Sequence, residues 1–224
     1  NINKSIFYFT LAANQNYPKA QFKLGLIYHD GEYIKQDINK SIYYFTLAAN
    51  QNHSGAQYDL GLIFYEGEYI KQDINKSIHY FTLAANQNHL RAQFILGLIF
   101  YEGEYIKQDI NKSIYYFTLA ANQNHPRAQF NLGLIYYENE YIKSDINKSI
   151  YYFTLAANQN DQNAQFNLGI IYYEGKYIKR DINKSIYYFT LAANQDNPRA
   201  QFNIGLIYYE GEYINRDIIK SIYY

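Results

Sequence analysis

The chain has 224 residues, and its 20 basic residues balance 20 acidic ones, so the formal net charge is zero. This balance argues against a nucleic-acid-binding protein, which needs a basic face to neutralise phosphates, and against electrostatic docking on an anionic membrane. There is no cysteine, which excludes disulfides and thiolate metal sites, and no apolar run approaches the roughly 18 residues that a membrane-spanning helix needs.

The sequence repeats itself every 36 residues. A period between about 20 and 50 residues is typical of solenoids, propellers and other repeat arrays. The elements below are therefore described for one copy, residues 109–144, and apply to the others by the same spacing. The positions that show the period most clearly are an aspartate and a glycine, at Asp37, Asp73, Asp109, Asp145, Asp181 and Asp217 and at Gly25, Gly61, Gly97, Gly133, Gly169 and Gly205.

The first element of a copy is predicted to be a helix that begins after Asp109 and ends near Asn124. Ile110, Ile114 and Phe117 are spaced four and three residues apart, which places them on one helix face. Asp109 stands at the N-cap position, where its carboxylate accepts free backbone N–H groups. Asn124 suits the end of the helix because asparagine tolerates the left-handed backbone that often terminates helices.

The second element is also predicted to be a helix, with Pro126 in its first turn. Ala128, Leu132 and Ile135 follow at spacings of four and three residues and form its apolar face. Asn139 marks its end, at a position that is glycine in the other copies, and this exchange predicts a left-handed cap.

Two further positions of the copy carry expectations about packing. Gly133 lies inside the second helix, at a cost of roughly 0.5–1 kcal/mol relative to alanine, which predicts that a neighbouring helix passes close to the backbone there. Tyr141 lies in the linker that follows, and we expect it and its counterparts to cover the next copy.

Helices of about 12 residues cannot bury their apolar faces alone, whereas stacked copies can. The predicted fold is all-α, a right-handed α-solenoid of stacked antiparallel helix pairs that curves into a superhelix. Residues 1–224 are expected to form a single array of about six copies. Residues 1–15 lack a partner helix and residues 217–224 are a stub, so we expect a fragment of a longer protein.

The repeat resembles the Sel-one-like repeat family, which is related to the tetratricopeptide repeat. The family unit has about 36 residues, a helix with the pattern Ala-x-x-x-Leu-Gly-x-x-Tyr-x-x-Gly and a second helix that ends in Ala-Ala. In this copy the matching residues are Ala128, Leu132, Gly133, Tyr136, Ala120 and Ala121. The resemblance implies a non-catalytic scaffold or adaptor that binds protein segments.

No catalytic, cofactor-binding or metal-binding residues are predicted. The recurring serines have no histidine base close to them in the sequence, which argues against a catalytic serine. His53, His89 and His125 share one position of the copy, and helices stacked roughly 8–10 Å apart cannot bring them to one metal ion. They are interpreted as polar residues before a helix start. Asn-Lys-Ser sequons such as Asn111 lie in a predicted helix, which disfavours glycosylation.

A candidate binding face follows from a helical wheel of the second helix. Arg127, Asn131, Leu134 and Glu138 fall opposite the apolar face, and Phe130 and Tyr137 flank them. In tetratricopeptide relatives the matching stripe lines the concave groove that holds peptides. The predicted concave face therefore comprises a basic, a middle and an acidic position in each copy, with flanking aromatic residues. The basic positions are Lys19, Arg91, Arg127 and Arg199, the middle positions are Asn131, Asn167 and Asn203, and the acidic positions are Glu102, Glu138 and Glu174. The flanking aromatic residues are Phe94, Phe130, Phe166, Tyr101, Tyr137 and Tyr173.

The leading functional hypothesis is a scaffold that binds a peptide or protein segment along this face, with no cofactor, no nucleic acid and no membrane insertion. One alternative is the regulatory region of a larger enzyme, such as a protein kinase, or of a ubiquitin-ligase adaptor complex. Another is end-to-end self-association of near-identical copies. No targeting segment is visible, which favours a cytoplasmic location.

Overall fold

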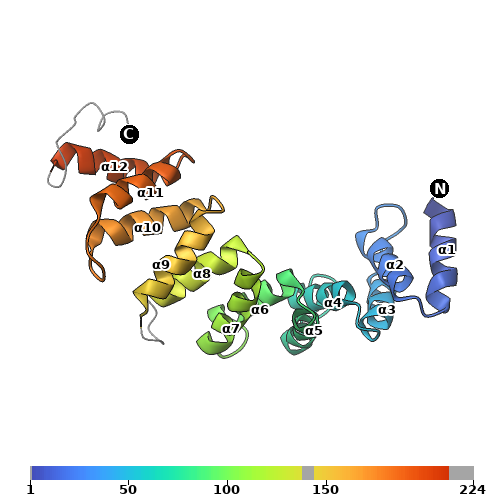
Figure 1. The fold of residues 1–224 in the computed structure, drawn as a ribbon. Coiled ribbons are helices and arrows are strands. Elements are labelled where there is room, and N and C mark those ends of the chain that lie inside the picture. Colours follow the sequence, from blue (N-terminus) through green and yellow to red (C-terminus); the bar gives the residue numbers. More distant parts are fainter. Residues whose placement is uncertain (1, 138–143, 212–224) are drawn as a thin grey trace. The chain divides into compact units, whose positions relative to one another are not determined.

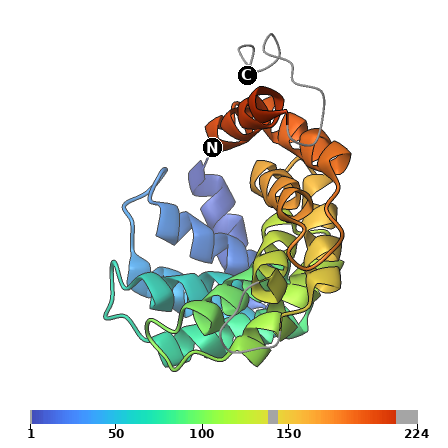
Figure 2. The ribbon, with the colours of Figure 1, turned by 90° about the vertical axis from the view of Figure 1, so that its left-hand side faces the viewer.

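The computed structural model describes residues 2–137 and 144–211, and in these ranges the chain forms twelve helices and no strand (Figure 1). Each helix is 12 or 13 residues long, and Figure 2 shows the same helices from a second side. The helices are α1 (Ile2–Asn14), α2 (Pro18–Asp30), α3 (Ile38–Ala49), α4 (Ser54–Glu66), α5 (Ile74–Asn86), α6 (Leu90–Glu102), α7 (Ile110–Asn122), α8 (Pro126–Tyr137), α9 (Ile146–Ala157), α10 (Gln162–Glu174), α11 (Ile182–Ala193) and α12 (Pro198–Glu210).

The chain divides into two compact units, residues 1–119 and 120–224, and the division falls within α7. Inside each unit the packing follows the 36-residue period. The helices α2, α4 and α10 each pack more extensively against the odd-numbered helix that follows than against the one that precedes. The repeating structural element in each unit is therefore a stacked pair of antiparallel helices, which confirms the all-α solenoid predicted from the sequence.

The odd-numbered helices begin where the aspartate caps were predicted. The backbone N–H of Lys112 donates to the Asp109 carboxylate at 3.0 Å, and the lysine Nζ lies 3.7 Å from the other carboxylate oxygen. The same cap recurs at Asp37, Asp73, Asp145 and Asp181. This local arrangement satisfies one of the N–H groups that a helix start leaves without a partner.

The turns use left-handed backbone, as expected. Asn124 has φ of 62°, and the equivalent asparagine or aspartate of every other described copy lies between 60° and 63°. Even-numbered helices end at a left-handed glycine, such as Gly103 with φ of 65°, whose N–H donates to the Ile99 carbonyl. The predicted cap at Asn139 lies outside the described residues. The helix lengths are therefore set by these two turn positions.

The core of each copy combines an odd-numbered helix with the even-numbered helices on either side. In the copy that spans α5 and α6, Phe81, Ala84, Ala92 and Leu96 are fully buried. The glycine inside each even-numbered helix leaves room for a phenylalanine ring of the helix that follows. A Cβ added at Gly61 would lie 2.5 Å from the nearest ring atom of Phe81. This confirms the predicted close approach, and a side-chain ring makes it rather than a backbone.

The linker tyrosines are placed differently from the expectation. The Tyr105 ring packs edge-on against Tyr65 at a centroid distance of 6.0 Å, and the Tyr177 ring packs likewise against Tyr137 at 6.1 Å. Each partner belongs to the preceding copy, so the prediction that these rings cover the next copy was wrong. The predicted example, Tyr141, lies outside the described residues. The linker rings Tyr105 and Tyr177 therefore lie against the even-numbered helix of the preceding copy.

None of the helices in residues 2–137 and 144–211 combines the length and the apolar character needed to cross a bilayer.

Candidate binding face of the even-numbered helices

The basic positions of the predicted face lie in the first turn of the even-numbered helices. Lys19, Arg91, Arg127 and Arg199 are all exposed. The first turn of a helix normally disfavours cations because the helix dipole is positive there. These side chains therefore gain nothing from the dipole of their own helix, and Arg91 also makes a side-chain hydrogen bond with Tyr58 of the preceding copy.

The middle positions are half-buried, at Asn131, Asn167 and Asn203. The Asn167 side-chain amide donates to the Asn163 carbonyl one turn earlier, at 2.9 Å. This bond uses one of the two amide protons and leaves the side-chain oxygen as an acceptor. The Asn167 side chain therefore keeps one amide proton and its oxygen for an extended peptide backbone.

The same position in α4 is Asp59, which is half-buried without a hydrogen bond or ion pair among the described residues. The pKa of this carboxyl is raised to about 6, mainly by burial. The nearby charges of His29 and Arg91 lower it, and that of Asp30 raises it. Among the described positions of the face, this carboxyl therefore has the pKa that departs most from its ordinary value.

The acidic residues Glu102 and Glu174 are the last residues of α6 and α10, and both are exposed. Glu174 is also linked to the preceding copy, since the Tyr137 hydroxyl donates to its carboxylate at 3.3 Å. Glu138 lies outside the described residues. The described part of the face thus has cations at the helix starts and carboxylates at the helix ends.

The flanking aromatic residues are engaged in packing. The Phe130 ring lies 5.7 Å from the buried Phe153 ring, and Phe94 and Phe166 make the equivalent contact with the odd-numbered helix that follows. Tyr137 and Tyr173 pack against the same buried clusters, and Tyr101 is half-buried. These rings lie beside the polar positions and are half-buried by packing against neighbouring helices.

Leu134 is the clearest error of the helical wheel. It was placed among the polar positions, but it packs against the core formed by α9 and α10. The even-numbered helices therefore bury two faces, one against each neighbouring copy. The exposed stripe between them is narrower than the wheel predicted.

The recurring serines serve packing within the solenoid. The Ser113 hydroxyl is fully buried and donates to the Gly97 carbonyl at 2.9 Å, and Ser77, Ser149 and Ser185 bond the equivalent glycine carbonyl. The glycine thus meets a phenylalanine ring and a serine hydroxyl from the same neighbouring helix. The Ser41 hydroxyl is buried without a partner in the described residues.

A ladder of buried glutamines was missed by the sequence analysis. The Gln57 side-chain amide donates to the Ala49 carbonyl at 3.1 Å, and its oxygen accepts from Gln87 at 2.7 Å. Gln51 and Gln21 make the same bond one copy earlier, and Gln195 and Gln165 make it in the second unit. The signal was available, because a glutamine stands at this position in every copy.

The three histidines that share one position cap the even-numbered helices. Nδ1 of His53 accepts the backbone N–H of Ala56 at 3.2 Å, and His89 and His125 make the same bond at 3.3 and 3.2 Å. This confirms that they are polar residues at a helix start. No group of three or more histidine, aspartate or glutamate side chains in the described ranges is placed to hold a metal ion.

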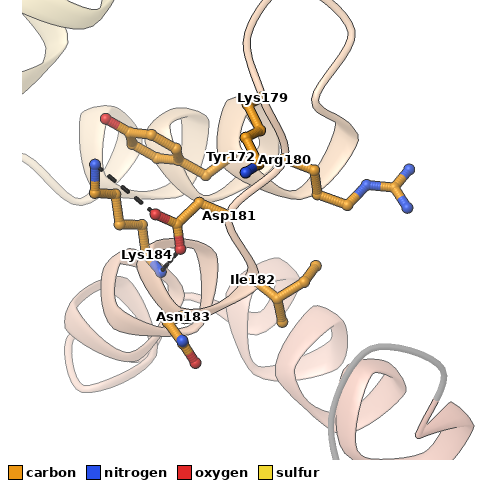
Figure 3. A pocket seen from close by; sticks show the side chains of 7 residues that line it. All are labelled: Tyr172, Lys179, Arg180, Asp181, Ile182, Asn183 and Lys184. Carbon is orange, nitrogen blue, oxygen red and sulfur yellow. Dashed lines mark hydrogen bonds and ion pairs between the residues drawn. The ribbon is translucent and has the colours of Figure 1, made fainter.

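A pocket of about 640 Å³ lies at the start of α11, outside the predicted face (Figure 3). Lys184 Nζ lies 3.8 Å from the Asp181 carboxylate and 5.0 Å from the centroid of the Tyr172 ring. Arg180 replaces the glutamine found in earlier copies, where Gln108 donates to the Tyr101 carbonyl at 2.6 Å. The remaining lining residues are Lys179, Ile182 and Asn183.

The family profile of the Sel1 repeat matches the chain from end to end. The matched segments are 1–17, 18–53, 54–89, 90–125, 126–161, 162–197 and 198–224. The chain belongs to the Sel1 repeat family. Proteins built from Sel1 repeats are generally protein-interaction scaffolds without catalytic activity of their own. No curated protein matches the chain in sequence.

Two solved structures support the assignment. A protective antigen of uropathogenic Escherichia coli that displays an SLR fold is 29% identical with a TM-score of 0.83 over 96% of this chain and 46% of the antigen. A Sel1 repeat protein from Oxalobacter formigenes is 28% identical with a TM-score of 0.82 over 98% of this chain and 64% of its own. The Sel1 repeats described here thus span less than two thirds of either relative.

Proposed function

We propose that this Sel1 repeat array is a non-catalytic scaffold that binds a peptide or protein segment along the stripe of its even-numbered helices. The observation that carries the proposal is the chemistry of the exposed stripe. Cations stand at helix starts, amides that retain hydrogen-bonding groups stand in the middle, and carboxylates stand at helix ends. An extended peptide with acidic side chains complements the first two rows.

The pattern of variation between copies agrees with this proposal. Buried positions such as Phe81, Phe117 and Phe153 are the same from copy to copy, whereas the middle stripe position changes between Asp59, Ile95 and asparagine. Packing fixes the buried positions because each must fit the glycine opposite. The stripe is free of that constraint, and its middle position carries a basic, an acidic, an apolar or an amide side chain depending on the copy.

A charge-reversal pair of variants tests the proposal. The Arg91→Glu, Arg127→Glu, Arg199→Glu variant is compared with Lys71→Glu, Lys107→Glu, Lys179→Glu, which changes the same charge at exposed linker positions. Binding is measured by fluorescence anisotropy with peptides selected from a random display library against the unmodified array. Reversing the charge at the three arginine positions is expected to weaken binding about tenfold or more. Each lost ion pair between an arginine and an acidic peptide side chain contributes about 0.5 kcal/mol. The proposal fails if both variants bind equally or if the library yields no binder.

A further inference from the structure

The three histidine caps are hydrogen bonds that only a neutral imidazole can make. In each of them Nδ1 is the acceptor and a backbone N–H of the helix is the donor. The ring proton must therefore lie on Nε2. A protonated imidazole carries hydrogen on both nitrogens, so it cannot accept the bond and instead places a donor against a donor.

The three rings are partly buried by their neighbours. The His53 ring stacks on Phe22 of α2 at a centroid distance of 4.3 Å, and the His89 ring stacks on Tyr58 of α4 at 4.6 Å. Burial lowers the pKa of all three rings. A backbone hydrogen bond acts in the opposite direction at His53. A nearby cation lowers each pKa further, and these cations are Lys19, Arg91 and Arg127 respectively.

The other copies have caps that differ in chemistry. Asp161 and Asn197 cap α10 and α12 with side-chain oxygens, at 2.9 and 3.1 Å, and Tyr17 makes no side-chain cap on α2. Proton-sensitive caps are therefore confined to α4, α6 and α8 among the described helices. Two of these helices carry Arg91 and Arg127 in the turn that the cap holds.

We propose that His53, His89 and His125 form a set of proton-sensitive caps, so that acidification loosens the first turns of α4, α6 and α8 while α10 and α12 stay capped. Because the folded state prefers the neutral ring, the contribution of each cap is complete above the ordinary histidine pKa of 6.5 and is lost as the pH falls below it. The caps do not depend on the proposed function. Only an effect of acidification on ligand binding at Arg91 and Arg127 would rest on it.

Hydrogen exchange measured by NMR at about pH 7 and about pH 5 tests the caps without any ligand. The protection factors of the Ala56, Ala92 and Ala128 amides are expected to fall at least about fivefold in acid, corresponding to the loss of a typical cap. The Ala200 amide, held by Asn197, is the internal control and should keep its protection. The proposal is overturned if the Ala200 amide loses protection as much as the other three.

A variant separates the caps from general acid sensitivity. The His53→Asn, His89→Asn, His125→Asn variant has at each position the asparagine cap that Asn197 already makes on α12, so the variant is expected to fold. Its three amides should keep their protection in acid, and an unchanged acid loss in this variant would refute the proposal. Imidazole nitrogen shifts of the unmodified chain give a second readout, since the neutral rings must carry their proton on Nε2. Finding it on Nδ1 would also refute the caps.

Discussion

Replacing the helical glycine of α4 tests how tightly the copies fit together. In an exposed helix Gly→Ala stabilises by about 1 kcal/mol. At Gly61 the new Cβ would lie 2.5, 2.6 and 3.0 Å from three atoms of the Phe81 ring, against an optimal separation of about 3.5–4.0 Å. The ring is fully buried, so it can yield only by moving its own neighbours.

The magnitude follows from these distances. A displacement of about 1 Å in a well-packed core falls at the upper end of the usual overpacking penalty of about 1–3 kcal/mol. After the gain in helix propensity, Gly61→Ala should lower the free energy of unfolding by about 2 kcal/mol. Gly55 lies in the same helix and is the matched control. Its Cβ would meet nothing closer than 3.2 Å, so Gly55→Ala should be neutral or stabilising by up to about 1 kcal/mol.

Urea unfolding followed by far-ultraviolet circular dichroism measures both changes. The double variant Gly61→Ala, Phe81→Leu completes the test, because a smaller side chain removes the clash. In this double-mutant cycle the double variant should be more stable, by at least about 1 kcal/mol, than the sum of the two single changes predicts. The reasoning is refuted if Gly61→Ala stabilises the array as much as Gly55→Ala does, or if the two sites prove additive.

Three further variants probe polar groups. Gln57→Leu should destabilise by about 2 kcal/mol in urea unfolding, since it removes two hydrogen bonds at about 1 kcal/mol each, whereas the Ala49 carbonyl keeps its bond from the Asn52 N–H. Asn197→Ala should cost about 1 kcal/mol by removing a cap, without a pH dependence between about pH 5 and 7. Asp59 has a folded pKa raised to about 6 from 3.8, so the folded state binds the proton more tightly and stability falls as the pH rises through that window. Asp59→Asn should therefore stabilise at pH 7, by up to about 3 kcal/mol, and change little near pH 4, and equal effects at both would contradict this account.

The fold could be predicted because its determinants are local and repeated. Asp109 and Asn124 fix where a helix begins and ends through their own backbone chemistry, and the spacing of Ile110, Ile114 and Phe117 defines its buried face. The exposure of the basic stripe positions and the placement of His53 and its counterparts before a helix start followed from the same local argument.

The remaining features depend on contacts between copies, which a helical wheel does not contain. Leu134 and Phe130 lie away from the core of their own helix pair but against the next odd-numbered helix. The buried role of Gln129 was missed for a related reason, because its partners are Ala121 on α7 and Gln159 in the turn after α9. A wheel treats each helix as having one buried face, whereas a stacked helix has two.

The interchangeable contacts between copies have a consequence for how such an array changes length. Gln21 accepts a bond from Gln51, and Gln57 accepts the same bond from Gln87. Removing residues 37–72 would bring Gln87 to Gln21 and Phe81 to Gly25, with the same partner types as before. Recombination between misaligned copies of the coding sequence therefore adds or deletes whole 36-residue units without breaking a buried bond. The number of stripe positions can thus change by whole copies while the interior stays unchanged.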